Sequence, residues 1–147
     1  MNKLIGFIMV FSSQVYAGVW GTGSFENDSA ADWAYELDLT KPASYLLAVF
    51  NAIPPNGYID ADACSVAIAA ADVTASLKDG KTENLPPSVA TWVVISKREY
   101  KPFFATKALE AIGYCKNTER SEIAQLWSEG DPQQWLDQVL KIETRLK

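Results

Sequence analysis

The stretch that decides the fold spans residues 20–33 and reads Trp20-Gly21-Thr22-Gly23-Ser24-Phe25-Glu26-Asn27-Asp28-Ser29-Ala30-Ala31-Asp32-Trp33. Its two glycines predict a tight turn, because glycine adopts positive φ angles that other residues resist. Trp20 and Phe25 flank this turn as large apolar side chains. Asn27, Asp28 and Ser29 are three successive candidates for a helix N-cap. Apolar residues then recur at helical spacing, so the stretch predicts an aromatic turn that leads directly into an amphipathic helix.

Apolar periodicity and punctuation by proline and glycine predict helices along the rest of the chain. We expect them near residues 28–39, 44–53, 60–77, 87–95, 102–115, 121–127 and 131–142. The third contains many alanines, so neighbours can approach it closely, and we place it at the centre. Residues 90–96 are rich in β-branched side chains and would suit a strand. A lone strand would have nothing to pair with, so the prediction is an all-α, single compact domain of six or seven short helices.

The turn resembles the opening signature of a small bacterial family known as domain of unknown function 4259. Two later segments agree with this resemblance, the alanine-rich run at residues 67–73 and the run Ser121-Glu122-Ile123-Ala124-Gln125-Leu126-Trp127. At Asp72 the family pattern leads us to expect glutamate. The resemblance implies a compact, mostly helical domain and brings no established activity. The residues that carry the motif are Trp20, Gly21, Gly23, Phe25, Asn27, Trp33, Ser121, Glu122 and Trp127.

The first 17 residues have the pattern of a cleaved signal peptide. Lys3 precedes the apolar run Leu4-Ile-Gly-Phe-Ile-Met-Val-Phe11, and small residues end at Ala17. A buried N-terminal helix is the alternative interpretation. We therefore expect a signal peptide at 1–17 and one soluble helical domain at 18–147, located in the periplasm or secreted, with no membrane insertion after cleavage.

Composition excludes several chemistries. The chain contains no histidine and only two cysteines, so it has no Ser-His-Asp triad, no imidazole base and no closed zinc site. Loss of Lys3 with the signal leaves 12 of the 13 basic residues against 18 acidic ones, a net charge of −6. An acidic domain is a poor candidate for nucleic acid or an anionic membrane surface, and it favours a basic protein partner. We expect no cofactor.

Carboxylates cluster in and after the turn, at Glu26, Asp28, Asp32 and Glu36. The last three recur every four residues, so a helix would align them on one face, where they could bind a cation or act as acid and base. The simpler interpretation is a helix cap followed by solvated acids that favour the positive helix start. The Gly-x-Gly pattern lacks a preceding strand and a lysine, so we reject a phosphate site and predict no metal or catalytic residues.

Asp72 interrupts the alanine-rich third helix. A buried carboxylate needs a partner, and we consider Arg98, Arg120 or a tryptophan indole. It is either a pocket acid or, as we favour, a structural hydrogen-bond acceptor. Together with Glu26, Asp28 and Asp32 it completes the set of candidate binding residues.

The two cysteines, Cys64 and Cys115, are expected to form a disulfide because an exported protein meets an oxidising compartment. Two buried free thiols are the alternative. The bridge requires the start of the third helix to meet the end of the fifth, as it would if those helices run antiparallel.

These features predict an exported protein that acts by binding another protein. An immunity or inhibitor protein that neutralises a basic exported toxin or enzyme is the leading hypothesis. The alternatives are a hydrolase that uses carboxylates alone and a structural protein of the cell envelope. The sequence contains no feature that selects one activity, and the tryptophans could equally serve the core or a binding face.

Overall fold

The computed structural model describes residue 19 and residues 21–147 of the chain. It contains α1 (Asp28–Glu36), α2 (Tyr45–Asn51), α3 (Ala61–Asp79), α4 (Pro87–Ser96), the short 3-10 helix η1 (Lys97–Glu99), α5 (Pro102–Cys115), α6 (Glu122–Ser128) and α7 (Pro132–Leu146). Extended pairing within the described residues is limited to two isolated bridges. The all-α prediction is confirmed. The predicted signal peptide and Trp20 lie outside the described residues.

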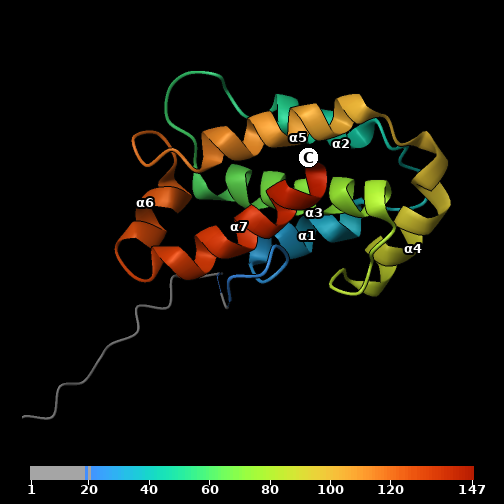
Figure 1. The fold of residues 1–147 in the computed structure, drawn as a ribbon, viewed down its shortest axis with the longest axis horizontal. Helices are drawn as coiled ribbons and strands as arrows, with labels where there is room; N and C mark the ends of the chain where they lie inside the picture. The colour runs from blue at the N-terminus through green and yellow to red at the C-terminus, as the bar shows by residue number, and fades with distance from the viewer. Residues whose placement is uncertain (1–18, 20) are drawn as a thin grey trace, which may run out of the picture.

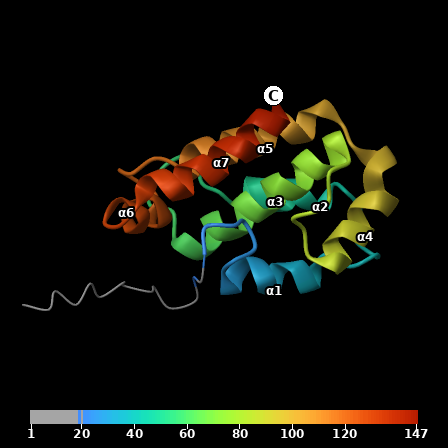
Figure 2. The same cartoon turned by 60° about the horizontal axis from the view of Figure 1, so that its bottom comes forward.

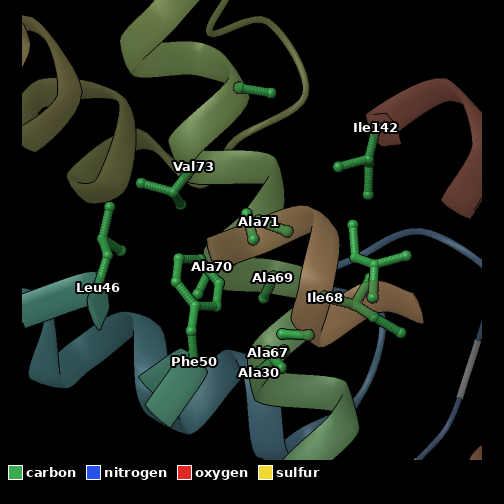
Figure 3. Packing of buried hydrophobic residues seen from close by; sticks show 14 of the residues in the cluster. Ala30, Leu46, Phe50, Ala67, Ile68, Ala69, Ala70, Ala71, Val73 and Ile142 are labelled. Atoms are coloured by element: carbon green, nitrogen blue, oxygen red, sulfur yellow. The ribbon is translucent and has the colours of Figure 1, made fainter. Parts of the chain in front are cut away.

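Helix α3 is the centre of the fold and packs against every other α-helix (Figures 1 and 2). Every residue from 67 to 77 is buried, because small side chains let neighbours approach α3 from all sides. Figure 3 shows Val73 pointing toward Leu46 and Phe50 of α2, whereas Ile68 lies toward Ile142 of α7. The expectation that the alanine-rich helix is central is therefore correct.

Most helix ends follow local signals. The Asn27 side chain caps α1 by accepting a hydrogen bond from the Ala30 N–H at 2.8 Å, so Asn27 is the cap among the three candidates. The predicted extension of this helix to residue 39 is wrong. Asp38 instead accepts hydrogen bonds from the backbone N–H and the hydroxyl of Thr40, which stabilises a turn in place of another helical turn.

The disulfide between Cys64 and Cys115 is present, with a Cα–Cα distance of 5.6 Å. Helices α3 and α5 run side by side in opposite directions (Figure 1), which brings the first turn of α3 to the end of α5. The predicted bridge is therefore confirmed.

At the other end of α3, Gly80 ends the helix. It adopts a left-handed conformation with φ 75°, and its N–H donates a hydrogen bond to the Ser76 carbonyl.

The loops that precede α3 and α6 are joined by backbone hydrogen bonds. The Ile59 N–H donates to the Arg120 carbonyl, and the Glu122 N–H donates to the Ile59 carbonyl, each at 2.9 Å. The Glu122 carboxylate accepts from the Ala61 N–H at 2.7 Å, and Ser121 caps α6 through the Ala124 N–H. Ser121 and Glu122 thus anchor α6 beside the start of α3.

Three tryptophans, Trp33, Trp92 and Trp135, are buried, and half-buried Trp127 stacks on Trp135. Trp33 is 5% exposed and stacks on Phe25 at 6.4 Å, but its indole N–H has no hydrogen-bond partner in the described part of the chain. By contrast, the Trp92 indole donates to the Lys41 carbonyl at 2.9 Å.

We therefore predict that Trp33→Phe lowers the free energy of unfolding by only about 1 kcal/mol, because it removes apolar volume but no hydrogen bond. The matched variant Trp92→Phe should cost about 1 kcal/mol more, because it also leaves the Lys41 carbonyl unpaired. Urea denaturation of both variants measures the difference. Equal losses would contradict the assignment of the two indole groups.

Candidate functional site

A groove with a volume of about 900 Å³ lies between the N-terminal turn at residues 22–26, α3 and α7. The turn lies against α3, just before α1 begins (Figure 2). Helix α3 contributes Ile68 and Asp72, and the loop before α4 contributes Asn84. Most of the remaining lining comes from α7, residues 134–145.

The turn holds the carboxylate of Glu26 at the groove. This carboxylate accepts a hydrogen bond from the Gly23 N–H at 3.1 Å. A Cβ atom at Gly21 or Gly23 would overlap the Glu26 carboxylate in its present position, so a larger residue there would require this side chain to move. The expected positive φ is wrong for Gly23, because the glycines with positive φ in the described chain are Gly57 and Gly80. The Glu26 side chain approaches the backbone closely at residue 23.

Asp72 lies at the groove and is 6% exposed. Its Oδ1 accepts from Arg145 Nη1 at 2.7 Å, and its Oδ2 accepts from Ser24 Oγ at 2.5 Å. The favoured interpretation as a hydrogen-bond acceptor thus agrees with the geometry. The expected partners are wrong, because the cation comes from α7 rather than from Arg98 or Arg120. Asp72 therefore connects the N-terminal turn, α3 and α7.

Arg145 extends this network to the end of α3. Its Nε and Nη2 donate to the two oxygens of Asp79 at 2.8 and 3.1 Å, and Nη2 also donates to Ser76 Oγ at 2.9 Å. Burial of Asp79 opposes its ionisation, but hydrogen bonds from Arg145 and the Lys81 N–H outweigh that effect and lower the pKa of Asp79. Hydrogen bonding to Asp79 is the main cause that raises the pKa of Arg145, against the effect of burial.

The four candidate binding carboxylates do not form one site. Glu26 and Asp72 line the groove, whereas Asp28 lines a second cavity of about 290 Å³ beside α6. Asp32 is exposed on α1, as is Glu36, which accepts a hydrogen bond from the Tyr45 hydroxyl. Within residues 19 and 21–147, no three His, Cys, Asp or Glu side chains are placed to hold a metal ion.

Sequence reasoning missed the residues that complete the groove. Arg145 gave no signal of its own, because a basic residue in the last turn of a helix is common. Asp72, Ser76 and Asp79, however, recur at spacings of four and three residues, which places them on one face of α3. That polar stripe on an otherwise apolar helix was the available sign of a buried network.

The fold and groove define a small, disulfide-bonded, all-α domain with a groove of mixed polar and apolar lining beside its central helix. The chain belongs to the family described as domain of unknown function 4259, whose model matches residues 18–138. No curated protein and no solved structure matches the chain. None of the described helices combines the length and the apolar character needed to cross a membrane.

Proposed function

We propose that this protein is an exported binding protein and that the groove beside α3 holds an extended, basic segment of a partner protein. The observation that carries the proposal is the lining of the groove. Amide side chains of Asn84, Gln134 and Gln138 offer donors and acceptors suited to a peptide backbone. Glu26 and Asp137 add exposed carboxylates that suit lysine or arginine side chains.

Apolar side chains give the same groove a surface for the non-polar parts of a peptide. Phe25 from the turn and Leu140 from α7 line it alongside the amides, and Leu140 is 54% exposed. Grooves that combine an apolar lining with a few oriented polar groups are typical of binding sites. The network of Asp72 and Arg145 keeps α7 and the turn in place, so the groove is present before a partner arrives.

Export to the periplasm or beyond is part of the proposal. The disulfide supports it, because such bonds persist in oxidising compartments, and the predicted signal peptide agrees with it. The overall charge of −5 supports a basic partner. A protein that neutralises a basic exported toxin or enzyme would combine these properties.

The proposal is tested by capture from periplasmic extract, followed by binding kinetics with the captured partner. We expect Glu26→Gln/Asp137→Asn to weaken binding by up to about 30-fold, because each of the two exposed charge pairs contributes up to about 1 kcal/mol. Added salt should slow association of the wild-type protein. The control Asp32→Asn/Glu119→Gln removes the same charge from exposed positions outside the groove.

Equal weakening by the groove variant and the control would overturn the assignment of the groove. An acidic partner whose association is independent of salt would overturn the charge argument. Turnover of a glycan by the purified protein, lost in Glu26→Gln, would instead support the carboxylate hydrolase.

A further inference from the structure

The corner between α4 and α5, residues 94–107, lies at one end of the molecule (Figure 1). Three of its apolar side chains are exposed. Val94 and Ile95 are 68% and 62% exposed, and Phe103 is 54% exposed. The exposed face of α4 carries Ser88 and Thr91 in its first half but Val94 and Ile95 in its last turn, where an amphipathic surface helix would have polar residues. Packing within the described chain therefore does not account for these three side chains.

The same corner concentrates positive charge. Residues 94–107 contain Lys97, Arg98, Lys101 and Lys107 against a single carboxylate, Glu99. Lys107 forms an ion pair with Glu110 at 3.2 Å, so the other three cations carry the excess. The Glu99 carboxylate accepts a hydrogen bond from the Ala43 N–H, which precedes α2, at 3.3 Å. Arg98 and Lys101 are exposed and form no ion pair within the described residues.

The opposite end of the molecule is acidic. Residues 117–131, which include α6, contain four carboxylates against one cation. Figures 1 and 2 place α6 and α4 at opposite ends of the long axis. An anionic surface would therefore attract the α4–α5 corner and repel the α6 end, which orients the molecule. The net charge of −5 would by itself predict that an anionic surface repels the molecule. Net charge, however, does not describe how the charges are distributed between the two ends.

We propose that the α4–α5 corner docks the protein on an anionic lipid surface. Val94, Ile95 and Phe103 enter the boundary between headgroups and acyl chains, while Arg98 and Lys101 bind lipid phosphates. Exposed apolar side chains flanked by cations are the combination that binds such interfaces. None of these five residues lines the groove, and a soft lipid surface needs no matching concavity on a projecting corner. This docking is independent of the groove's partner.

The test is flotation of the full chain with vesicles of equal parts phosphatidylcholine and phosphatidylglycerol. Arg98→Gln/Lys101→Gln should bind about 25-fold more weakly, because each basic residue near an anionic surface contributes about 1 kcal/mol. Val94→Ser should weaken binding about tenfold, because a buried methyl-bearing side chain is lost from the interface. The control Lys141→Gln/Lys147→Gln makes the same change in net charge outside residues 94–107. Lys141 lines the groove, which takes no part in lipid docking, so this variant should bind vesicles like wild type.

All variants share residues 1–18, so differences among them report on the corner. Equal weakening in the control, or equal binding to pure phosphatidylcholine vesicles, would overturn the proposal. Head-to-tail association with a second copy uses the same charge asymmetry. A mass that rises with protein concentration without vesicles, and that Arg98→Gln/Lys101→Gln returns to the monomer, would assign the corner to that contact and overturn lipid docking.

Discussion

Replacing both cysteines, as Cys64→Ala/Cys115→Ala, is expected to lower the free energy of unfolding by about 4 kcal/mol. The bridge spans a sequence separation of 51 residues, so its loss restores much conformational freedom to the unfolded chain. Both sulfur atoms are buried where α3 meets α5. Alanine at both positions avoids leaving an unpaired thiol beside Ser121, whose hydroxyl lies 3.7 Å from Cys64 Sγ. Urea denaturation without a reductant measures the loss.

The wild-type protein unfolded in the presence of a thiol reductant provides the matched control, and it should approach the stability of the double variant. Thiol titration of unfolded, unreduced protein should find no free cysteine. Two free thiols per chain in protein from its native compartment would contradict the bridge, as would a loss of stability near zero.

Arg145→Met is expected to lower the free energy of unfolding by about 3 kcal/mol, the lower end of the range for leaving a buried charge without its partner, because Asp72 is buried whereas Arg145 is half-buried. Methionine preserves most of the side-chain length, so the loss arises mainly from charge and hydrogen bonds. Asp72 is buried and would retain only the Ser24 hydroxyl among its hydrogen-bond partners. Asp79 would lose the two bonds from the guanidinium group. Thermal or urea denaturation near neutral pH measures the effect.

Two further variants distinguish loss of the Arg145 interactions from a general destabilisation of α7. Lys141→Met, exposed on the same helix, should change stability by less than about 0.5 kcal/mol. Asp72→Asn/Arg145→Met should recover part of the loss, because it removes the uncompensated buried charge. Failure of the second variant to recover any stability would show that Arg145 acts through packing alone.

The pH dependence of the free energy of unfolding provides a second test of the role of Arg145. The folded-state pKa of Asp79 is lowered, so its contribution to stability is complete above the ordinary value of 3.8 and is lost as the pH falls through the folded value. The advantage of wild type over Arg145→Met should therefore shrink below about pH 3.8. An advantage that stays constant through this acid range would contradict the role of Asp79.

Local signals were sufficient to predict much of the secondary structure. Proline in the first turn marks the start of α5 at Pro102 and of α7 at Pro132. Asn27 and Ser121 cap the helices that follow them. These signals act over one helical turn, so their meaning does not depend on the rest of the fold. Helix α1 ends at Glu36 rather than residue 39 because the turn at Asp38 and Thr40 competes with a further helical turn.

The candidate site was only partly predictable. Glu26 and Asp72 were selected as carboxylates that could bind, and both line the groove. Their neighbours on α7 were not selected, because an amphipathic helix presents amides and charges on its outer face whether or not a groove lies beneath them. Helical spacing aligns Asp28 with Asp32 and Glu36 but not with Glu26. The Glu26 carboxylate instead turns back to accept a hydrogen bond from the Gly23 N–H.

The sequence by itself determined the all-α class, a central alanine-rich helix and the requirement that a buried Asp72 have a partner. Only the tertiary structure decided that this partner is Arg145, which lies 73 residues further along the chain. It also decided which end of the molecule is basic, although the net charge is negative. Periodicity and helix caps depend on contacts between residues a few positions apart, so they can be recognised in the sequence. Pairing between helices depends on the angles at which the helices pack, and these angles result from all the core side chains together.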